Sequence, residues 1–295
     1  MSHAFRRHTQ PPEIVACPPT SDHMLDRRGP SARKGEWSVS TTDPGSVARR
    51  DARGRRILTL ADVSGVLEHR LHLPSIDLHA LRAGCAYAIE HGLAAVTCRP
   101  EHVPEAATIL ADTGVGLVAG LDFEHRHSGG VNEHAWAEEV RKLSDGGASE
   151  LAVIANAERL SPESQGSLVA ALERLVSLEE QCGFRLRVHL DPTGLSDSAI
   201  VAACELFAAC GVWMVQGGTW LGERTGFRHV TLMRDALGSG PLLKWTHPVP
   251  SLHVLLLALA EGVDRFNADI ADILRNARWQ QRLTPITVPL PGIDY

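Results

Sequence analysis

Lys244 is the residue of this chain best suited to covalent chemistry. Its neighbours in the sequence are apolar, with Leu242 and Leu243 before it and Trp245 after it. An amine in apolar surroundings holds its proton less tightly, and a neutral amine can act as a nucleophile or a general base. A carboxylate close to Lys244 would instead keep it charged and inert, so both interpretations stay open.

A run of alternating ionisable residues precedes Lys244 in the chain. Arg187, His189 and Asp191 occupy every second position, and residues spaced in this way share one face of a β-strand. His189 and His247 can exchange protons near neutral pH, which predicts acid–base chemistry. The alternative is that each histidine is a hydrogen-bonded packing residue.

A third polar group reads Asp-Phe-Glu-His-Arg-His over residues 122–127. Carboxylates and imidazoles ligate divalent metals. However, the spacing matches no established ligand motif. We therefore expect no metal and no cofactor, and a polar loop that contributes Asp122 to substrate binding.

The elements that position these residues follow a repeated pattern. From residue 60, a short apolar or β-branched run is followed by a longer amphipathic stretch, about eight times. Such alternation predicts parallel strands with helical crossovers, closed into a (β/α)8 TIM barrel. The predicted strands are 65–71, 93–98, 115–121, 150–155, 184–190, 212–216, 241–245 and 263–267, and the predicted helices include 78–91, 133–143, 162–181, 197–210 and 252–261.

Both ends of the chain differ from this pattern. Residues 1–56 are rich in arginine and proline without apolar periodicity, which predicts a disordered extension or, alternatively, an interaction arm or targeting peptide. Residues 57–278 form the predicted barrel. Residues 279–295 contain Pro285, Pro289 and Pro291 and predict an extended tail.

Composition restricts the partners. The chain has 295 residues, 44% of them hydrophobic, which suits one barrel domain. Residues 1–56 hold 11 basic and 6 acidic residues, whereas residues 57–295 hold 18 and 29, a net charge of −11. An acidic body lacks the basic surface that nucleic acids require. Six cysteines without a C-x-x-C pair, and no run of eighteen apolar residues, predict a cytoplasmic protein that does not enter membranes.

Several segments, in order along residues 61–278, resemble motifs of the deoxyribose-phosphate aldolase family. Residues 66–71 (Val-Leu-Glu-His-Arg-Leu) resemble the family's opening Ile-Asp-His-Thr-Leu, and residues 92–100 resemble its Gly-x-Ala-Ala-Val-Cys-Val-x-Pro strand. Residues 146–154 lie where the family has Gly-Ala-Asp-Glu-Ile-Asp-Met-Val, and residues 262–266 resemble Gly-Ala-Asp-Arg-Ile. The resemblance implies an aldolase-like lyase on a TIM barrel.

The differences from the family lie at its chemistry. The family's sixth strand ends in Lys-Thr-Ser-Thr-Gly with the Schiff-base lysine, and that position is Gln216, whose amide cannot form an imine. The family's proton-shuttling aspartate falls on Ala152. Its phosphate-binding turns read His247-Pro248 and Asn267-Ala268-Asp269. We therefore do not expect ordinary deoxyribose 5-phosphate cleavage.

Other family positions keep their chemical character. Glu68 stands for aspartate, Arg187 for lysine and Asp191 for glutamate, whereas Thr219 and Lys244 are retained. Because charges inside a barrel are costly unless paired, we expect Glu68, Arg187, Asp191 and Lys244 to form one network. Gly217 and Gly218 either bring backbone N–H groups to a bound oxyanion or only permit a tight turn.

The sequence thus predicts an enzyme that performs aldol-type or related acid–base chemistry on a small carbonyl or sugar-like compound. The alternative is a non-catalytic protein that binds a metabolite or a partner protein; a homodimer is compatible with either. The prediction requires residues 216 and 244 to lie on neighbouring strands. The predicted catalytic residues are Lys244, Asp191, Glu68, His189 and Arg187, and the predicted substrate-binding residues are Gln216, Thr219, Gly217, Gly218, His247, Asn267 and Asp122.

Overall fold

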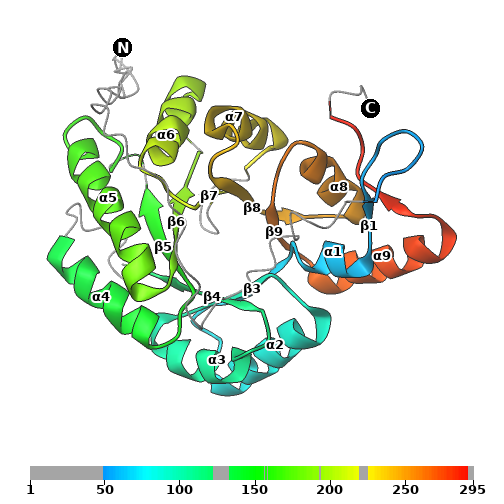
Figure 1. Ribbon diagram of the computed structural model, residues 1–295, viewed down its shortest axis with the longest axis horizontal. Coiled ribbons are helices and arrows are strands. Elements are labelled where there is room, and N and C mark those ends of the chain that lie inside the picture. Colours follow the sequence, from blue (N-terminus) through cyan, green and yellow to red (C-terminus); the bar gives the residue numbers. More distant parts are fainter. Residues whose placement is uncertain are drawn as a thin grey trace, which may run out of the picture.

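Eight parallel strands form a closed barrel in the computed structural model (Figure 1). The structure describes residues 49–121, 133–155, 157, 159–192, 194–218 and 225–291, without the side chains of residues 133–136, 247 and 248. The barrel closes where the amide of Phe266 donates to the carbonyl of Val66 at 2.8 Å. In chain order the strands are β2 (Glu68–Leu71), β3 (Ala95–Cys98), β4 (Gly116–Gly120), β5 (Glu150–Ala155), β6 (Arg185–Leu190), β7 (Met214–Gly217), β8 (Leu242–Val249) and β9 (Arg265–Ala268).

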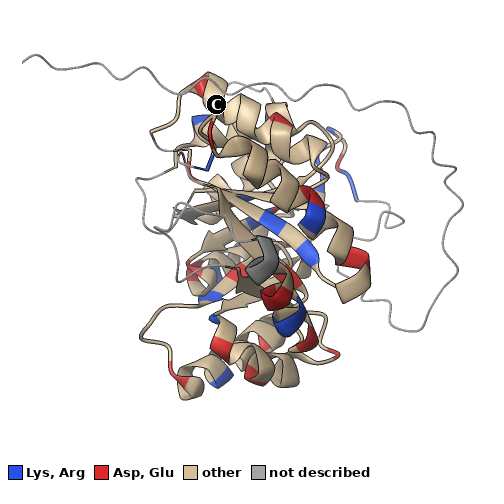
Figure 2. Ribbon diagram, turned by 90° about the vertical axis from the view of Figure 1, so that its left-hand side faces the viewer, with Lys and Arg blue, Asp and Glu red and all other residues tan. Residues whose placement is uncertain are grey.

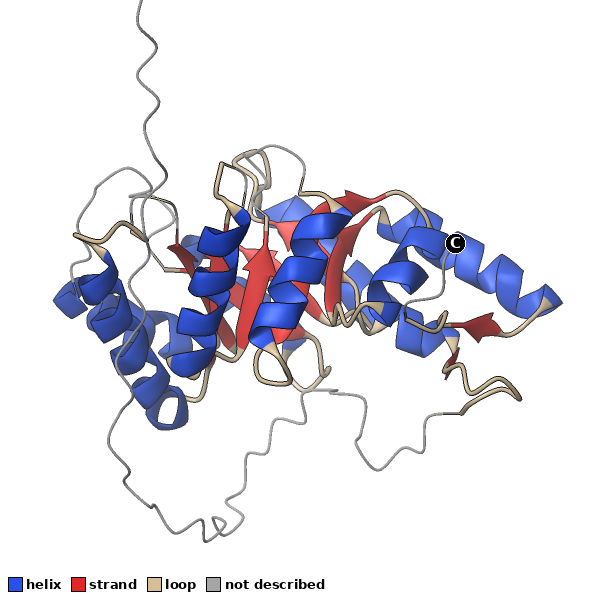
Figure 3. Cartoon of the chain, turned by 90° about the horizontal axis from the view of Figure 1, so that it is seen from above, coloured by secondary structure: helices blue, strands red, loops and turns tan. Residues whose placement is uncertain are grey.

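Helices surround the strands on the outside, as the view from above shows (Figure 3). Several begin at residues whose side chains accept the first free backbone N–H groups, such as Asp77, Ser196 and Ser251. The helices are α1 (Leu60–Ser64), α2 (Leu78–His91), the 3-10 turn η1 (Pro100–His102), α3 (Val103–Leu110), α4 (Glu133–Asp145), α5 (Gln165–Cys182), α6 (Asp197–Ala209), α7 (Phe227–Leu237), α8 (Leu252–Ala260) and α9 (Ile270–Leu283).

The predicted fold class is confirmed. All eight predicted strands coincide with β2–β9, and the five predicted helices coincide with α2, α4, α5, α6 and α8. Strand β8 is longer than predicted, because it continues past residue 245 to Val249 through a register shift against β9. The predicted disordered extension falls almost entirely outside the described residues.

The tail begins later than predicted, since α9 continues to Leu283 and residues 279–283 are therefore helical. Beyond it, β10 (Ile286–Thr287) pairs antiparallel with β1 (Ile57–Leu58), with Leu58 opposite Ile286. The segments that precede and follow the barrel in the sequence thus pair in one two-stranded sheet beside α1 and α9 (Figure 1).

Two different interiors result from the alternation of side chains along the strands. Between sheet and helices lies a continuous apolar core, which includes Leu151, Val188 and Phe266. Inside the barrel, small apolar residues from β3, β4 and β5 pack together on one side. Charged residues stand directly beside them, since Ala95 is paired with Glu68, Val118 with Glu150 and Ala152 with Arg187.

The surface of the folded part carries both signs of charge over the outer helices (Figure 2). No helix among the described residues is long and apolar enough to cross a membrane.

Candidate active site

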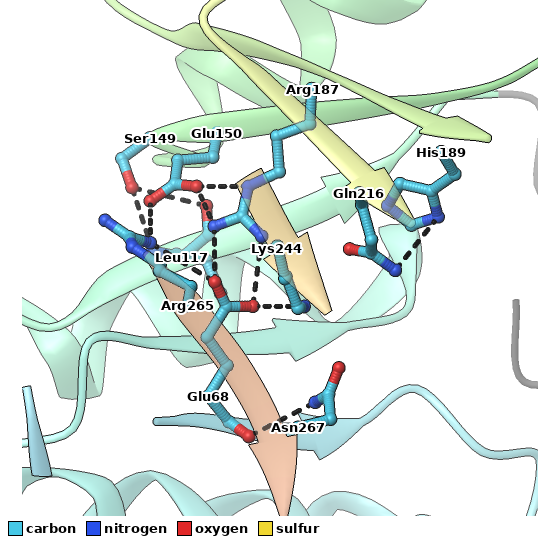
Figure 4. A network of polar contacts seen from close by, with 10 residues as sticks. All are labelled: Glu68, Leu117, Ser149, Glu150, Arg187, His189, Gln216, Lys244, Arg265 and Asn267. Atoms are coloured by element: carbon cyan, nitrogen blue, oxygen red, sulfur yellow. Dashed lines mark hydrogen bonds and ion pairs between the residues drawn. The ribbon is translucent and has the colours of Figure 1, made fainter. Parts of the chain in front are cut away.

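Gln216 and Lys244 lie side by side inside the barrel. They are paired across β7 and β8, and each is only 2% exposed. The close view shows both side chains directed into the interior (Figure 4). The predicted placement of the two residues on neighbouring strands is therefore confirmed.

Glu68 is the centre of a buried group of charges (Figure 4). Its Oε2 accepts hydrogen bonds from Lys244 Nζ at 2.5 Å and from Arg187 Nη1 at 3.0 Å. Its Oε1 lies 3.3 Å from Arg265 Nη1. Arg187 and Arg265 also pair with Glu150, the latter at 3.0 Å. We call these five residues the interior network.

Glu150 and Arg265 are functional candidates that sequence reasoning missed. A signal was present, because Glu150 stands two residues before Ala152 and Arg265 two residues before Asn267, on the same faces of β5 and β9. The guanidinium of Arg265 also lies 5.3 Å from the centre of the Trp213 ring, and that of Arg187 lies 5.8 Å from it. Such stacking helps to stabilise the buried cations.

The interior network lies below the carboxyl ends of the strands. Glu68, Glu150 and Arg265 are the first residues of β2, β5 and β9. Lys244 is paired with Arg265 across β8 and β9 and its amine contacts Glu68, so the amine is part of this charged layer. The carboxyl ends of the strands, where barrel enzymes hold their substrates, lie beyond it.

Burial changes the ionisation of Lys244. Loss of hydration lowers the pKa of its amine to about 8, the Glu68 carboxylate opposes that shift, and the Arg187 guanidinium adds to it. Although burial opposes ionisation of Glu68, the three cations around it hold its pKa well below the usual value. Lys244 can therefore release its proton near neutral pH while Glu68 remains charged.

His189 is neutral in the folded barrel. Burial, together with the positive charges of Lys244 and Arg187, holds its pKa well below the usual value for histidine. Its Nδ1 lies 3.5 Å from Nε2 of Gln216, at the outer limit of a hydrogen bond. His189 can therefore exchange protons only as a neutral imidazole at pH 7.

Two buried oxygen atoms near Lys244 have no hydrogen-bond partner among the residues that the structure describes. They are Oε1 of Gln216 and Oγ1 of Thr246. Thr246 stands two residues after Lys244 on β8 and is 4% exposed. Buried polar atoms normally have partners, so these two atoms need an explanation.

The sequence of this chain is similar to those of known aldolases. No family model matches the chain. A deoxyribose-phosphate aldolase of Rhodopirellula baltica is 26% identical over 233 residues, which cover 78% of this chain and 95% of that protein. One of Rhizobium meliloti is 27% identical over 237 residues, 79% of this chain and 89% of that protein. The chain is a distant relative of the deoxyribose-phosphate aldolases.

Solved structures of aldolases share the fold. The deoxyribose-phosphate aldolase of Aeropyrum pernix superposes with a TM-score of 0.65 at 18% identity, over 75% of this chain and 92% of the other. An aldolase named QR15 gives a TM-score of 0.66 at 18% identity, over 75% and 98% of the two chains.

The interior at Ala152 differs from that of an aldolase with an aspartate there. Ala152 is fully buried and packs with Ala95 and Val118 in an apolar cluster. Its methyl group cannot give or take a proton, whereas a carboxylate at this position would stand beside Arg187 on β6. Ala152 itself therefore offers no group that could exchange a proton, although it stands beside Arg187 of the interior network.

The two glycines after Gln216 serve packing. A Cβ on Gly217 would lie 2.8 Å from Sδ of Met233, so its lack of a side chain lets α7 approach the barrel. Gly218 has a φ of +92°, and its N–H donates to the carbonyl of Leu190 at 2.9 Å. That N–H group is therefore engaged in the sheet, which favours the tight-turn interpretation.

The remaining predicted residues are placed as follows. Asn267 donates from Nδ2 to the backbone carbonyl of Glu68 at 3.3 Å. Asp191 follows the end of β6 and is half-buried. The contacts that define the interior network join Glu68, Arg187 and Lys244 as predicted, with Glu150 and Arg265 in addition. Thr219 and Asp122, with the rest of residues 122–127, lie outside the described residues, and His247 lies within β8 without a described side chain.

Proposed function

We propose that this protein forms an imine between Lys244 and a small oxygenated carbonyl compound, and uses it for aldol-type carbon–carbon chemistry or a related proton transfer. Its relatives are named as aldolases of deoxyribose phosphate. The proposal keeps their class of chemistry, moves the amine from position 216 to position 244, and changes the substrate.

The charge balance of the interior network carries this proposal. Fully ionised, the network has three cations and two carboxylates. An uncompensated charge is costly in a barrel interior. Arginine does not lose its proton in proteins, so Lys244 is the cation that can restore neutrality. A neutral lysine amine is the form that attacks a carbonyl group.

The covalent step joins Lys244 to the substrate and releases water. The amine nitrogen of Lys244 bonds to the carbonyl carbon, and a proton passes from nitrogen to the carbonyl oxygen. Protonation of that hydroxyl releases water and leaves a protonated imine. In the cleavage direction, the hydroxyl group on the second carbon from the imine carbon loses its proton to a base. The bond between that carbon and the carbon next to the imine then breaks, and the electron pair of this bond moves towards the imine nitrogen.

The other predicted residues assist these steps in the proposal. Glu68 and Arg187 position the amine and set its ionisation, whereas His189 and Asp191 exchange protons with the substrate. Substrate binding is assigned to Gln216, His247 and Asn267, and to Thr219 and Asp122 outside the described residues. Gly217 and Gly218 form the turn that follows Gln216.

Reductive trapping tests the proposal sharply, because the chain has three lysines, Lys34, Lys142 and Lys244. With limiting aldehyde and borohydride, peptide mass spectrometry is expected to place the adduct on Lys244. Lys244→Met removes that adduct, whereas Lys142→Met, which replaces an exposed lysine of α4, retains it. Adducts that form on Lys142 but not on Lys244 would contradict the proposal.

A second candidate function is a non-catalytic binding protein. Gln216 and Ala152 favour it, because neither side chain can form an imine or exchange a proton. Absence of both a Lys244 adduct and aldehyde turnover would support this candidate over the enzyme.

A further inference from the structure

We infer that Gln216 and Thr246 bind a hydroxyl group of the substrate, and that this substrate is an uncharged hydroxyaldehyde or hydroxyketone. The inference rests on the proposed function, because it specifies the compound that reaches Lys244. It adds a pair of residues that determine specificity and a chemical class of ligand.

The two side chains lie on the same inner face as the amine. Gln216 is paired with Lys244 across β7 and β8, and Thr246 follows Lys244 by two residues. A Cβ placed on Gly218 would lie 3.8 Å from Cβ of Thr246, so the end of β7 closes against this part of β8. Gln216 therefore lies beside Lys244, and Thr246 follows Lys244 on the side of the carboxyl ends.

Their oxygen atoms indicate what kind of group belongs between them. Oε1 of Gln216 and Oγ1 of Thr246 are both buried without a partner among the described residues. A buried polar group that stays unpaired is unfavourable, so a ligand that pairs with it binds more tightly. A hydroxyl group can donate to Oε1 and accept from the threonine hydroxyl at the same time. Because a hydroxyl group both donates and accepts, it can also pair with the amide of Gln216 if the amide oxygen and nitrogen exchange places.

The start of α9 argues against a phosphorylated substrate. In many TIM barrels, phosphate binds at the loops after the last two strands and at a helix N-terminus there. In this chain the carboxylate of Asp269 accepts from the amide of Asp272 at 3.2 Å at that place, and Asp272 adds a second carboxylate to the first turn. Because Asp272 also pairs with Arg275, the charge that repels a phosphate dianion at this end of the barrel comes mainly from Asp269.

The concentration dependence of trapping at Lys244 tests the inference. Glycolaldehyde, which has a hydroxyl group, is expected to half-saturate the reaction at a lower concentration than acetaldehyde, which has none. The near-isosteric changes Gln216→Met and Thr246→Val are each expected to raise the half-saturating concentration of glycolaldehyde about five- to tenfold relative to that of acetaldehyde. Thr108→Val, at a surface threonine of α3, is the matched control.

Two outcomes separate this inference from the proposed function. If Lys244 is trapped but the two variants affect both aldehydes equally, the inference is overturned and the imine chemistry stands. If no aldehyde is trapped, the imine chemistry is overturned, and saturation-transfer NMR with glycerol then tests the hydroxyl site alone. Loss of the glycerol signal in both variants supports the site, and an unchanged signal overturns it.

Discussion

The carboxylate of Glu68 is shared by three cations, one of which is Lys244. Glu68 accepts from Lys244 and from two arginines, so it cannot hold the lysine proton as strongly as it would in an isolated pair. The neighbouring Gln216 carries no charge. The reactivity of the amine therefore depends on the balance of the whole interior network.

This balance predicts the effect of Glu68→Gln on pH dependence. In the native protein, trapping at Lys244 should rise with pH through about 8, as the amine loses its proton. The Glu68 carboxylate raises the pKa of Lys244, so its removal lowers that pKa further and moves the midpoint to lower pH. The rate of borohydride-dependent labelling across pH measures the shift. Glu105→Gln, in an exposed pair with Arg82, is the control and should leave the midpoint unchanged. A midpoint that moves to higher pH would contradict this account.

Glu150→Gln tests whether the interior network stabilises the barrel. The substitution keeps the shape of the side chain but leaves Arg187 and Arg265 with one buried carboxylate instead of two. We expect the free energy of unfolding to fall by about 3–5 kcal/mol, as for other broken buried ion pairs. Urea unfolding measures the change, and Glu105→Gln should cost less than about 1 kcal/mol. Equal costs for the two variants would show that the network contributes no net stability.

At the scale of elements, the strands and helices could be predicted because apolar periodicity depends on local sequence. The length of β8 could not be predicted, because a histidine followed by a proline at 247–248 is typical of a strand end. Pairing with β9 resumes at Val249 only through a register shift, which a sequence does not show. Glu150 and Arg265 escaped prediction for a related reason. Which charges meet inside a barrel depends on the stagger between strands, and a single sequence does not show that stagger.

Helix α9 provides a prediction at this scale. Asp269→Asn keeps a side chain that can cap the helix, so stability should change little. It removes one of the two carboxylates at the helix start. Trapping with glyceraldehyde 3-phosphate should therefore improve relative to glyceraldehyde, by about two- to fivefold at low salt. Asp145→Asn, at the far end of α4, is a control for the loss of one surface charge. A ratio that stays the same in Asp269→Asn would mean that α9 does not select against phosphate.

At the scale of the whole molecule, the candidate active site and the two-stranded sheet formed by the ends of the described chain belong to different parts of the fold. The interior network and Gln216 come from strands β2 and β5–β9, whereas β1 and β10 pair beside α1 and α9. The solved aldolase structures share this fold over most of their length. The proposed chemistry therefore requires only a few inward side chains, and the pairing of the chain ends is expected to contribute to stability alone.

Ile286→Ala tests that separation. Ile286 is completely buried and pairs with Leu58, so its truncation leaves a cavity where the two ends of the chain meet. The free energy of unfolding should fall by about 2–4 kcal/mol, against about 1 kcal/mol for Ile286→Val. Urea unfolding gives both values, and trapping at Lys244 in the same samples should be unchanged, because β10 is not part of the barrel sheet. If Ile286→Ala instead slowed trapping while the protein stayed folded, the ends of the chain would have to be coupled to the position of Lys244.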